Sequence, residues 1–594
     1  MSILSKASLV QIPSGYAEDK LYSEVPNTTA GDLQFIRAST GTRVNADGYI
    51  EDVPWNLLNY SEELTAANGW RQTLGLTTQL TTETNPINVN SCYKTIADTN
   101  TNSHYTYSTN VIGNLSYFGG FCVSFYAKPN GYNWVRYWNN NNAFGVDINI
   151  VTGEIQNKRE DSIDTILVED APNGWTKVSL QFDRLISYSY AMLKPMPTAL
   201  GNSTFAGDGV SGMFLWGIQI SKGLNFKSYI KRTDGFDVPR LDYSGGASCP
   251  TLLLEPQRAN KSNNSEDWTV SGYVKNNCTA TANQTTSPDN NQTADQLDFG
   301  SGSGFFYEVV TTITAASTYS VFVKYINYQY IQIIGTGDVD HYANFDIQNG
   351  IVGNTGSEST ASIEDYGNGW YRCIINYNSG TFAGGARVYK TTSLTAGWAS
   401  GGGVAGSFYF WGNQMEVGTF HTSYIPSSGT STTRVAEFCN KTSISSLIGQ
   451  TEGTFLLDFV YTGLYDNGLS FLTRLAEDNT NTNRIGIYSL RSSDALRTFC
   501  DSNNVSQFDA QIGSLVVGQR YKVAMRYKTN DYSIYLNGTN VYTNITANVP
   551  LVLNDYVLGN IPNTSQFSNF CKTNQATLFK IALTDDELET LTTI

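Results

Sequence analysis

One stretch of this sequence occurs twice at a fixed distance. "EDAPNGWTKV" (169–178) is matched by "EDYGNGWYRC" (364–373), which places Trp175 and Trp370 195 positions apart. Two further pairs have the same separation: Trp216 with Trp411, and Tyr229 with Tyr424. A constant offset over this length indicates that one fold is present in two copies.

The composition and turn signals of the repeats predict an all-β fold. The chain has 53 Gly and 37 Tyr but only 15% charged residues, which favours short strands joined by polar turns. Asn173-Gly174 and Asn368-Gly369 are typical hairpin turns. The adjacent acids Glu169 and Asp170 could suggest acid–base chemistry, but neighbours on a strand face opposite ways. We therefore interpret the duplicated stretch as a hairpin corner.

The chain divides into four predicted parts: an N-terminal segment (1–52), two jelly-roll repeats (53–235 and 236–430) and a C-terminal domain (431–594). The first segment is too short to build a core, so we expect it to dock on other subunits and to attach the chain to a larger assembly. A disordered tail is the alternative, but Leu33, Phe35, Ile36 and Val44 are more apolar than a linker needs. We expect the remaining domains to fold without this segment.

Charge and cysteine usage limit the partners. With 52 acidic and 37 basic residues the net charge is -15, which disfavours nucleic acid and anionic membrane surfaces. The eight cysteines are dispersed and form no CxxC pair, so we expect mostly free thiols; a disulfide framework is the alternative. The N-terminus lacks the apolar core of a signal peptide, so we expect synthesis in a reducing cytoplasm and no membrane insertion.

Each repeat opens with a stretch that resembles tailed-bacteriophage fibre proteins, including those of crAss-like phages of Bacteroidota. The stretches are "FIRASTGTRVNADGYIEDVPWNLLNYSEELTAANGW" (35–70) and "RLDYSGGASCPTLLLEPQRANKSNNSEDW" (240–268). The resemblance implies jelly-roll modules like carbohydrate-binding modules, a homotrimer located on the virion, and attachment to capsid or tail proteins through residues 1–52. We favour a head fibre over a tail fibre because no long collagen-like, coiled-coil or β-helical shaft is present.

The C-terminal part resembles the concanavalin-like, laminin-G-type fold. "GTFLLDFVY" (453–461) and "YKVAMRYKTNDYSIYLNGTNV" (521–541) carry this resemblance, together with "LFKIALTDDELETL" (578–591), where we predict a capped helical turn. The acids that could meet a calcium ion there are Asp458, Asp531 and Asp555, but they lack a calcium-loop spacing. We expect solvated turn acids and no metal.

No catalytic motif stands out, and we predict that the protein is not an enzyme and needs no cofactor. The three histidines (104, 341 and 421) are far apart, and no nucleophile elbow, P-loop or HExxH motif occurs. A glycosidase needs only two facing carboxylates, so a polysaccharide-degrading tailspike remains an alternative. A secreted bacterial glycan-binding protein is the other alternative, although it would need an export signal.

The strongest binding signal is the aromatic stretch "NWVRYW" (133–138). Strand alternation places Val135 and Tyr137 on one face, and comparison with "YIQI" (330–333) identifies that face as the core. The residues predicted on the other, open face are the glycan-binding candidates: Trp134, Arg136, Trp138, Tyr330 and Gln332. Aromatic planes beside hydrogen-bonding groups suit sugar rings. The alternative is that these aromatics pack under a loop or against a neighbouring subunit.

Overall fold

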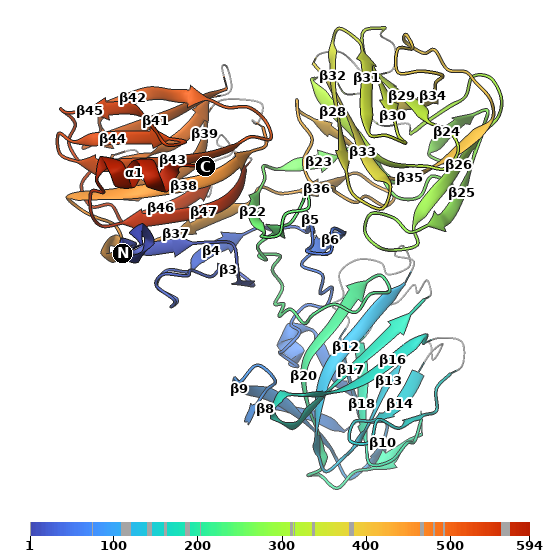
Figure 1. The fold of residues 1–594 in the computed structure, drawn as a ribbon. Coiled ribbons are helices and arrows are strands. Elements are labelled where there is room, and N and C mark those ends of the chain that lie inside the picture. Colours follow the sequence, from blue (N-terminus) through green and yellow to red (C-terminus); the bar gives the residue numbers. More distant parts are fainter. Residues whose placement is uncertain are drawn as a thin grey trace. The chain divides into compact units, whose positions relative to one another are not determined.

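The fold is all-β, as predicted (Figure 1). The computed structural model describes residues 2–73, 75–108, 120–138, 145–159, 163–183, 191–201, 203–308, 310, 313, 315–335, 339–378, 385–463, 469–478, 482–490, 494–559 and 571–594. In this part of the chain the single α-helix is α1 (Asp585–Thr592), and the described residues include no helix with the length and apolar character that a bilayer crossing requires. All eight cysteines are free, as expected, and six of them are buried.

The chain forms two compact units, and the smaller one interrupts the larger one in sequence. The larger unit joins Met1–Val53 to Asp237–Ile594, and the smaller unit is Pro54–Phe236. The smaller unit contains the first repeat. The larger unit contains the second repeat and the C-terminal sandwich.

Repeat 1 is a sandwich of two six-stranded antiparallel sheets. One sheet has the order β15-β14-β13-β18-β11-β7 and the other β16-β17-β12-β20-β9-β8. The first sheet contains β7 (Trp70–Thr73), β11 (Tyr105–Ser108), β13 (Trp134–Trp138), β14 (Gly145–Asn149), β15 (Ile155–Gln156) and β18 (Ala191–Met196). The second contains β8 (Leu76–Thr84), β9 (Asn90–Ala97), β12 (Phe121–Asn130), β16 (Thr165–Ala171), β17 (Trp175–Phe182) and β20 (Gly212–Lys222).

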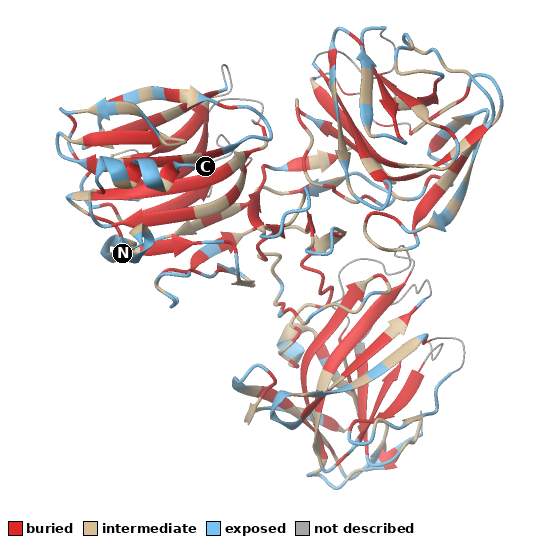
Figure 2. Cartoon of the chain, viewed as in Figure 1, coloured by how far each residue is buried: buried red, intermediate tan, exposed pale blue. Residues whose placement is uncertain are grey.

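Repeat 2 has the same two sheets with the same strand order, which confirms the duplication. The orders are β31-β30-β29-β34-β27-β24 and β32-β33-β28-β35-β26-β25. The first sheet contains β24 (Tyr273–Asn276), β27 (Phe305–Glu308), β29 (Tyr330–Gly335), β30 (Tyr342–Asp346), β31 (Ile351–Thr355) and β34 (Ala386–Lys390). The second contains β25 (Cys278–Thr285), β26 (Ala294–Phe299), β28 (Ser317–Tyr325), β32 (Ser359–Asp365), β33 (Trp370–Tyr377) and β35 (Gly406–Val417). Figure 2 shows the buried residues that fill each sandwich.

The duplicated tryptophan corner has the same geometry in both copies. Trp175 begins β17, and its indole Nε1 donates to the backbone oxygen of Thr84 at 2.8 Å. Trp370 begins β33 and donates to the backbone oxygen of Thr286 at 3.0 Å. The turns before them have left-handed backbones, with φ of 62° at Asn173, 73° at Gly174, 52° at Asn368 and 79° at Gly369. The predicted Asn-Gly turns are therefore confirmed.

A β-bulge lies next to each tryptophan of the second pair, Trp216 and Trp411. The register of β12 against β20 shifts next to Trp216, and β28 against β35 shifts next to Trp411. Gly217 and Gly412 follow these tryptophans with φ of 59° and 64°, a conformation that glycine adopts at little cost. Both indoles are buried and lie 4.6 Å, centroid to centroid, from the ring of Tyr229 or Tyr424.

The C-terminal sandwich recruits strands from three distant parts of the chain. Its sheets have the orders β2-β3-β4-β37-β46-β39-β40-β41-β42 and β21-β22-β47-β38-β43-β44-β45, with β1 beside β47. The strands of the C-terminal part are β37 (Phe438–Lys441), β38 (Glu452–Tyr461), β39 (Leu469–Ala476), β40 (Arg484–Leu490), β41 (Ala495–Ser502), β42 (Val505–Ser514), β43 (Arg520–Lys528), β44 (Tyr532–Leu536), β45 (Thr539–Asn544), β46 (Asp555–Gly559) and β47 (Cys571–Phe579). The predicted helical cap of α1 is confirmed by reciprocal bonds between Thr584 and Glu587.

The N-terminal segment belongs to this sandwich. The strands from the N-terminal segment and from the linker before repeat 2 are β1 (Leu9–Gln11), β2 (Tyr16–Ala17), β3 (Lys20–Leu21), β4 (Leu33–Ile36), β21 (Leu241–Asp242) and β22 (Thr251–Leu254). β1 pairs with β47 and β4 with β37, which buries Leu9, Leu33 and Phe35 completely. The expectation that the segment docks on other subunits is therefore corrected: it docks on its own chain. The expectation that the other domains are complete without it is also wrong for the C-terminal sandwich and for the second repeat, because buried clusters of both include its apolar side chains.

Five buried charges connect the segments of the larger unit. Arg37, Arg240 and Arg434 meet Glu255 and Glu437, and each of these side chains is at most 1% exposed. Arg37 lies 2.6 Å from Glu437, and Arg434 lies 2.8 Å from Glu255. Arg240 contacts both glutamates. This charge cluster ties the N-terminal segment to the linkers on either side of repeat 2.

We expect Glu437→Gln to destabilise the larger unit. Burial alone would raise the pKa of Glu437, but Arg240 and Arg37 hold it below its ordinary value, so the residue is a carboxylate in the folded protein. Removing one partner of a buried ion pair leaves the others uncompensated, and we expect a loss of about 3 kcal/mol in the free energy of unfolding. Urea unfolding measures it. The matched control is Glu452→Gln, in an exposed pair with Lys528, which should change little. An equal effect of the two variants would contradict the role of the cluster.

The smaller unit is inserted between the two segments of the larger one in sequence. Arg37 holds both ends of the interruption, because its Nη2 donates to Val53 O and its backbone N donates to Asp237, each at 2.6 Å. The sequence Asp-Val-Pro occurs at each boundary, at 52–54 and at 237–239.

Replacing residues 54–236 by a short Gly-Ser linker should therefore leave a folded protein. The ion pairs of the charge cluster and the strand pairings of β1 and β4 join residues of the remaining chain. Circular dichroism and urea unfolding measure the outcome, with the intact chain as control. A variant that lacks a cooperative transition would show that the larger unit depends on repeat 1.

Candidate functional site

The predicted division of "NWVRYW" into two faces is confirmed. Val135 and Tyr137 lie in the core of repeat 1, and Ile331 and Ile333 lie in the core of repeat 2. The strand registers align the two stretches residue by residue, with Arg136 in the place of Gln332. Trp134, Arg136 and Gln332 therefore face away from the main core.

The prediction that this outer face is open is wrong for four of the five candidates. Trp134 is 9% exposed, Trp138 7%, Arg136 4% and Gln332 0%; Tyr330 alone is partly exposed. The connection from β18 to β20 in repeat 1 (residues 197–211) packs on Trp134 and bonds to Asp147, and the connection from β34 to β35 in repeat 2 (391–405) bonds to Gln332; we call these the cover loops. Trp138 packs instead against the ring of Tyr105, with centroids 4.9 Å apart. Trp134 packs in a second, smaller cluster with Met196 and Phe205. The alternative of aromatics beneath a loop is the one that the structure bears out.

The polar candidates anchor the cover loops. In repeat 1, Arg136 pairs with Asp147 at 2.6 Å, and Asp147 accepts the backbone N–H of Gly201 at 2.7 Å. In repeat 2 the same positions hold Gln332 and Asn344, which bond at 2.8 Å. Their side-chain amides donate to cover-loop oxygens, Gln332 to Gly397 (2.7 Å) and Asn344 to Ala396 (2.8 Å). The ion pair of repeat 1 is replaced by an amide pair in repeat 2, and each pair bonds to the cover loop of its repeat.

Two further details show that the covered face of repeat 1 is a structural site. A Cβ atom at Gly145 would lie 2.5 Å from the Arg136 guanidinium, so a larger residue there would displace this side chain from its position beside Asp147. Burial and the nearby Arg136 lower the pKa of Lys194 to about 8, while its ammonium group donates to the Ser203 oxygen at 2.5 Å.

Because Trp134 is covered, we expect Trp134→Ala to lower the free energy of unfolding by about 3 to 5 kcal/mol, the cost of truncating a buried aromatic residue. Thermal and urea unfolding of repeat 1 measure this loss. The matched control is Trp398→Ala, since Trp398 is 37% exposed on the other cover loop. A Trp134→Ala protein as stable as the parent would mean that the cover loop leaves this ring accessible.

The other half of each outer face carries an aromatic pair that the described residues leave partly exposed. Tyr105 and Tyr107 alternate on β11 with buried neighbours, and Phe305 and Tyr307 do so on β27. All four rings are half-buried. The ring centroids of the first pair are 5.8 Å apart, and those of the second pair 6.2 Å. We call the two pairs the aromatic platforms of repeats 1 and 2.

An arginine lies beside each platform. Arg71 is the cross-strand neighbour of Tyr107 and is exposed. Arg387 is the cross-strand neighbour of Tyr307, and its guanidinium lies 4.8 Å from that ring and 5.4 Å from the ring of Phe305. The Nε of Arg387 is buried without a hydrogen-bond partner, and no ion pair of this arginine occurs among the described residues.

These arrangements suit the recognition of a sugar. Flat aromatic faces stack on the C–H groups of a pyranose, and a fixed guanidinium donates to hydroxyl or carboxylate oxygens. Strand alternation in "YTYS" (105–108) and "FFYE" (305–308) is the sequence signal that would have found the platforms. It was missed because these strands are only four residues long.

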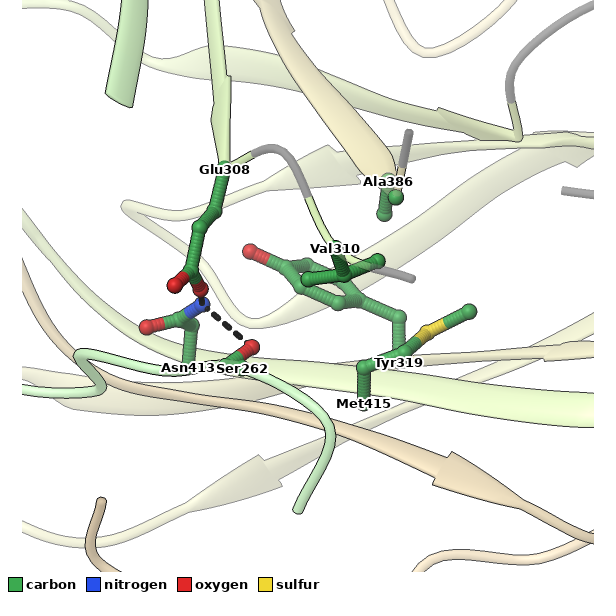
Figure 3. Close-up of a pocket in the computed structure, with 8 residues that line it drawn as sticks. Ser262, Glu308, Val310, Tyr319, Ala386, Asn413 and Met415 are labelled. Atoms are coloured by element: carbon green, nitrogen blue, oxygen red, sulfur yellow. Dashed lines mark hydrogen bonds between the residues drawn. The ribbon is translucent and has the colours of Figure 1, made fainter. Parts of the chain in front are cut away.

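The pocket in Figure 3 is a structural cavity with room for about one water molecule. Glu308 lines it, and burial raises the pKa of this carboxyl group. Its Oε1 accepts the backbone N–H groups of Asn263 (2.7 Å) and Asn264 (3.1 Å), while the side-chain amide of Asn413 donates to the Ser262 hydroxyl at 2.9 Å. These hydrogen bonds hold the opening stretch of repeat 2 against the sheet.

The other candidate groups are dispersed in the structure. His104 is buried and bonds to backbone oxygens, and His421 pairs with Glu364 at 3.1 Å. The three acids considered for calcium have different partners: Asp458 with Arg520, Asp531 with Arg526, and Asp555 with the backbone N–H of Ser443. Within the described residues no group of three or more His, Cys, Asp or Glu side chains could hold a metal ion.

No protein-family model and no curated protein sequence matches this chain. Among solved structures, a carbohydrate-binding module (CBM40) of the Ruminococcus gnavus IT-sialidase, bound to alpha2,3 sialyllactose, is similar at 13% identity and a TM-score of 0.22, over 25% of this chain and 87% of that one. Domain 4 of the arabinanase AbnA from Geobacillus stearothermophilus, in complex with arabinotriose, gives 14% identity and a TM-score of 0.22, over 26% and 73%. These scores are too low to carry an argument about ligands.

Proposed function

We propose that the protein is a non-catalytic glycan-binding protein whose aromatic platforms are the binding sites. The observation that carries the proposal is the repeated outward pair, Tyr105 with Tyr107 and Phe305 with Tyr307, each with an arginine alongside. Sugars lie on such surfaces because the rings offer apolar planes next to hydrogen-bond donors. Two weak sites on one chain gain strength when the target presents several glycans.

We further propose that the chain is an adhesive fibre protein of a tailed-bacteriophage virion, a head fibre in preference to a tail fibre, assembled as a homotrimer. The resemblance of residues 35–70 and 240–268 to phage fibre proteins supports this role. Contact with capsid or tail proteins would use the outer side of the N-terminal strands, because their apolar side chains already lie in the C-terminal sandwich. Antibody labelling of purified phage particles tests the location, and light scattering of the purified chain tests the trimer.

Replacing the second ring of both platforms should abolish most glycan binding. The Tyr107→Ala/Tyr307→Ala double variant loses a half-buried stacking surface in each repeat, and we expect the affinity to fall about tenfold per site. The measurement is binding of the full-length chain to a glycan microarray, followed by titration with the best oligosaccharide. The matched control is Tyr22→Ala, which removes an exposed tyrosine elsewhere on the chain.

The array separates the outcomes. Loss of binding in the double variant, with unchanged unfolding and unchanged binding by the Tyr22→Ala control, supports glycan binding at the aromatic platforms. Binding that survives the double substitution would place the sugar site elsewhere. A full-length chain that binds no glycan at any density would contradict the proposed function.

A further inference from the structure

A β-hairpin caps one face of repeat 2. The hairpin is β5 (Gly41–Val44) with β6 (Ile50–Val53), and its cross-strand pair Val44 and Ile50 packs on an aromatic cluster on the outer side of the β32–β25 sheet. The members of that cluster include Phe322, Trp370, Trp411 and Tyr424. The hairpin also donates two hydrogen bonds, from Ile50 N to Pro288 O (2.9 Å) and from the Thr42 hydroxyl to Tyr424 O (2.5 Å).

Repeat 1 has the same aromatic cluster without a hairpin. Tyr126, Trp175, Trp216 and Tyr229 occupy the corresponding positions, with Tyr126 opposite Trp216 as Phe322 is opposite Trp411. The ring centroids of Tyr126 and Trp216 are 5.2 Å apart, against 5.4 Å for Phe322 and Trp411. Every member of the repeat 1 cluster comes from the smaller unit itself, and no β5–β6-like hairpin occurs among the described residues of that unit.

Exposure differs between the two faces as a missing cap predicts. Phe322 is 0% exposed and Tyr424 3%, but Tyr126 and Tyr229 are only half-buried.

The loop at the edge of this aromatic cluster also differs between the two repeats. Where the loop of repeat 2 has Asp289 and Asn291, repeat 1 has Ile87 (57% exposed) and Val89 (48% exposed). The loops correspond because Thr84 and Thr286 receive the same tryptophan bond and Asn88 and Asn290 share φ values of 64° and 63°. Repeat 1 therefore exposes more apolar surface where repeat 2 is covered.

The bonding groups that would receive a hairpin are available in repeat 1. Pro86 O and Tyr229 O correspond to the two oxygens that bind the β5–β6 hairpin, and the described residues donate no hydrogen bond to either. The indole Nε1 of Trp216 is buried without a partner, whereas that of Trp411 donates to Thr293 at 3.1 Å. Unmet bonding groups beside exposed aliphatic side chains are typical of an interface.

We propose that this face of repeat 1 is a docking site for a β-hairpin that belongs to a different protein. The site, which we call the hairpin dock, consists of Tyr126, Phe214, Trp216 and Tyr229 with Ile87 and Val89 at its rim. Its partner presents a cross-strand pair of aliphatic side chains and one free edge N–H, as residues 41–53 present them to repeat 2. The proposal does not depend on glycan binding, since the platforms lie on the other sheet.

The donor is another protein because the chain's own hairpins of this kind are already engaged. β5–β6 lies on repeat 2, and β21–β22 pairs with β47 in the C-terminal sandwich. Releasing either would expose buried residues such as Val53 and Leu252, which are 0% exposed. A second copy of the chain would have to pay that cost to donate a hairpin.

The test uses a ring-closed peptide of residues 41–53 as a fluorescent probe for the full-length chain. We expect saturable binding to one site per chain, because the corresponding face of repeat 2 is occupied. Tyr126→Arg places a charge in the dock and should weaken binding at least tenfold. The matched control is Leu80→Arg, which introduces the same charge at an exposed position of the same repeat. A peptide with Val44→Asp and Ile50→Asp should not bind.

A second variant tests the dock without changing Tyr126, in case Tyr126→Arg impairs folding. Ile87→Asp/Val89→Asn installs the residues that repeat 2 carries and should weaken peptide binding several-fold without altering thermal unfolding. Absence of saturable binding, or equal binding by the Tyr126→Arg and Leu80→Arg proteins, would overturn the proposal. Oligomers of the intact chain that Tyr126→Arg dissolves would identify a second copy as the occupant and would contradict a different protein.

Discussion

The buried charge cluster is the interaction on which the larger unit depends. Arg37, Arg240 and Arg434 come from segments about 200 residues apart in the chain, and they converge on Glu255 and Glu437 in a region without solvent. Burying these charges is costly, and the cost is offset only when all of them are present together. The N-terminal segment, both linkers and the C-terminal sandwich are therefore stabilised as one body, and the hairpin that caps repeat 2 begins only four residues after Arg37.

The two repeats show how one scaffold acquires different surfaces. Strand order and tryptophan corners are the same in both repeats, whereas several outward side chains differ. Arg136 with Asp147 becomes Gln332 with Asn344 under the cover loop, and a capped face in repeat 2 is uncapped in repeat 1. The aromatic platforms occur in both copies. A surface feature that persists while its surroundings change is the better candidate for a shared function, which is why we propose glycan binding at the platforms and partner binding at the dock.

Local patterns in the sequence predicted the parts of the fold that depend on near neighbours. Strand parity placed Val135 and Tyr137 in the core, and the Asn-Gly turns and the cap of α1 follow from two to four adjacent residues. Contacts between distant segments could not be predicted in this way. Trp134 is covered by a loop some 65 residues later, and β4 pairs with β37 about 400 residues away, so neither burial has a local signature. The platforms had a local signature, but in strands of only four residues it was too short to recognise.

We propose that glycans bind the half of each outer face that carries the aromatic platform and not the half beneath the cover loop. A crystal structure of the chain with an oligosaccharide identified by array screening tests it most directly. We expect sugar density stacked on Tyr307 or Tyr107, with the Arg387 or Arg71 guanidinium donating to its oxygens and both cover loops in place. Density at Trp134 with the cover loop displaced, or on the C-terminal sandwich with both platforms empty, would contradict it.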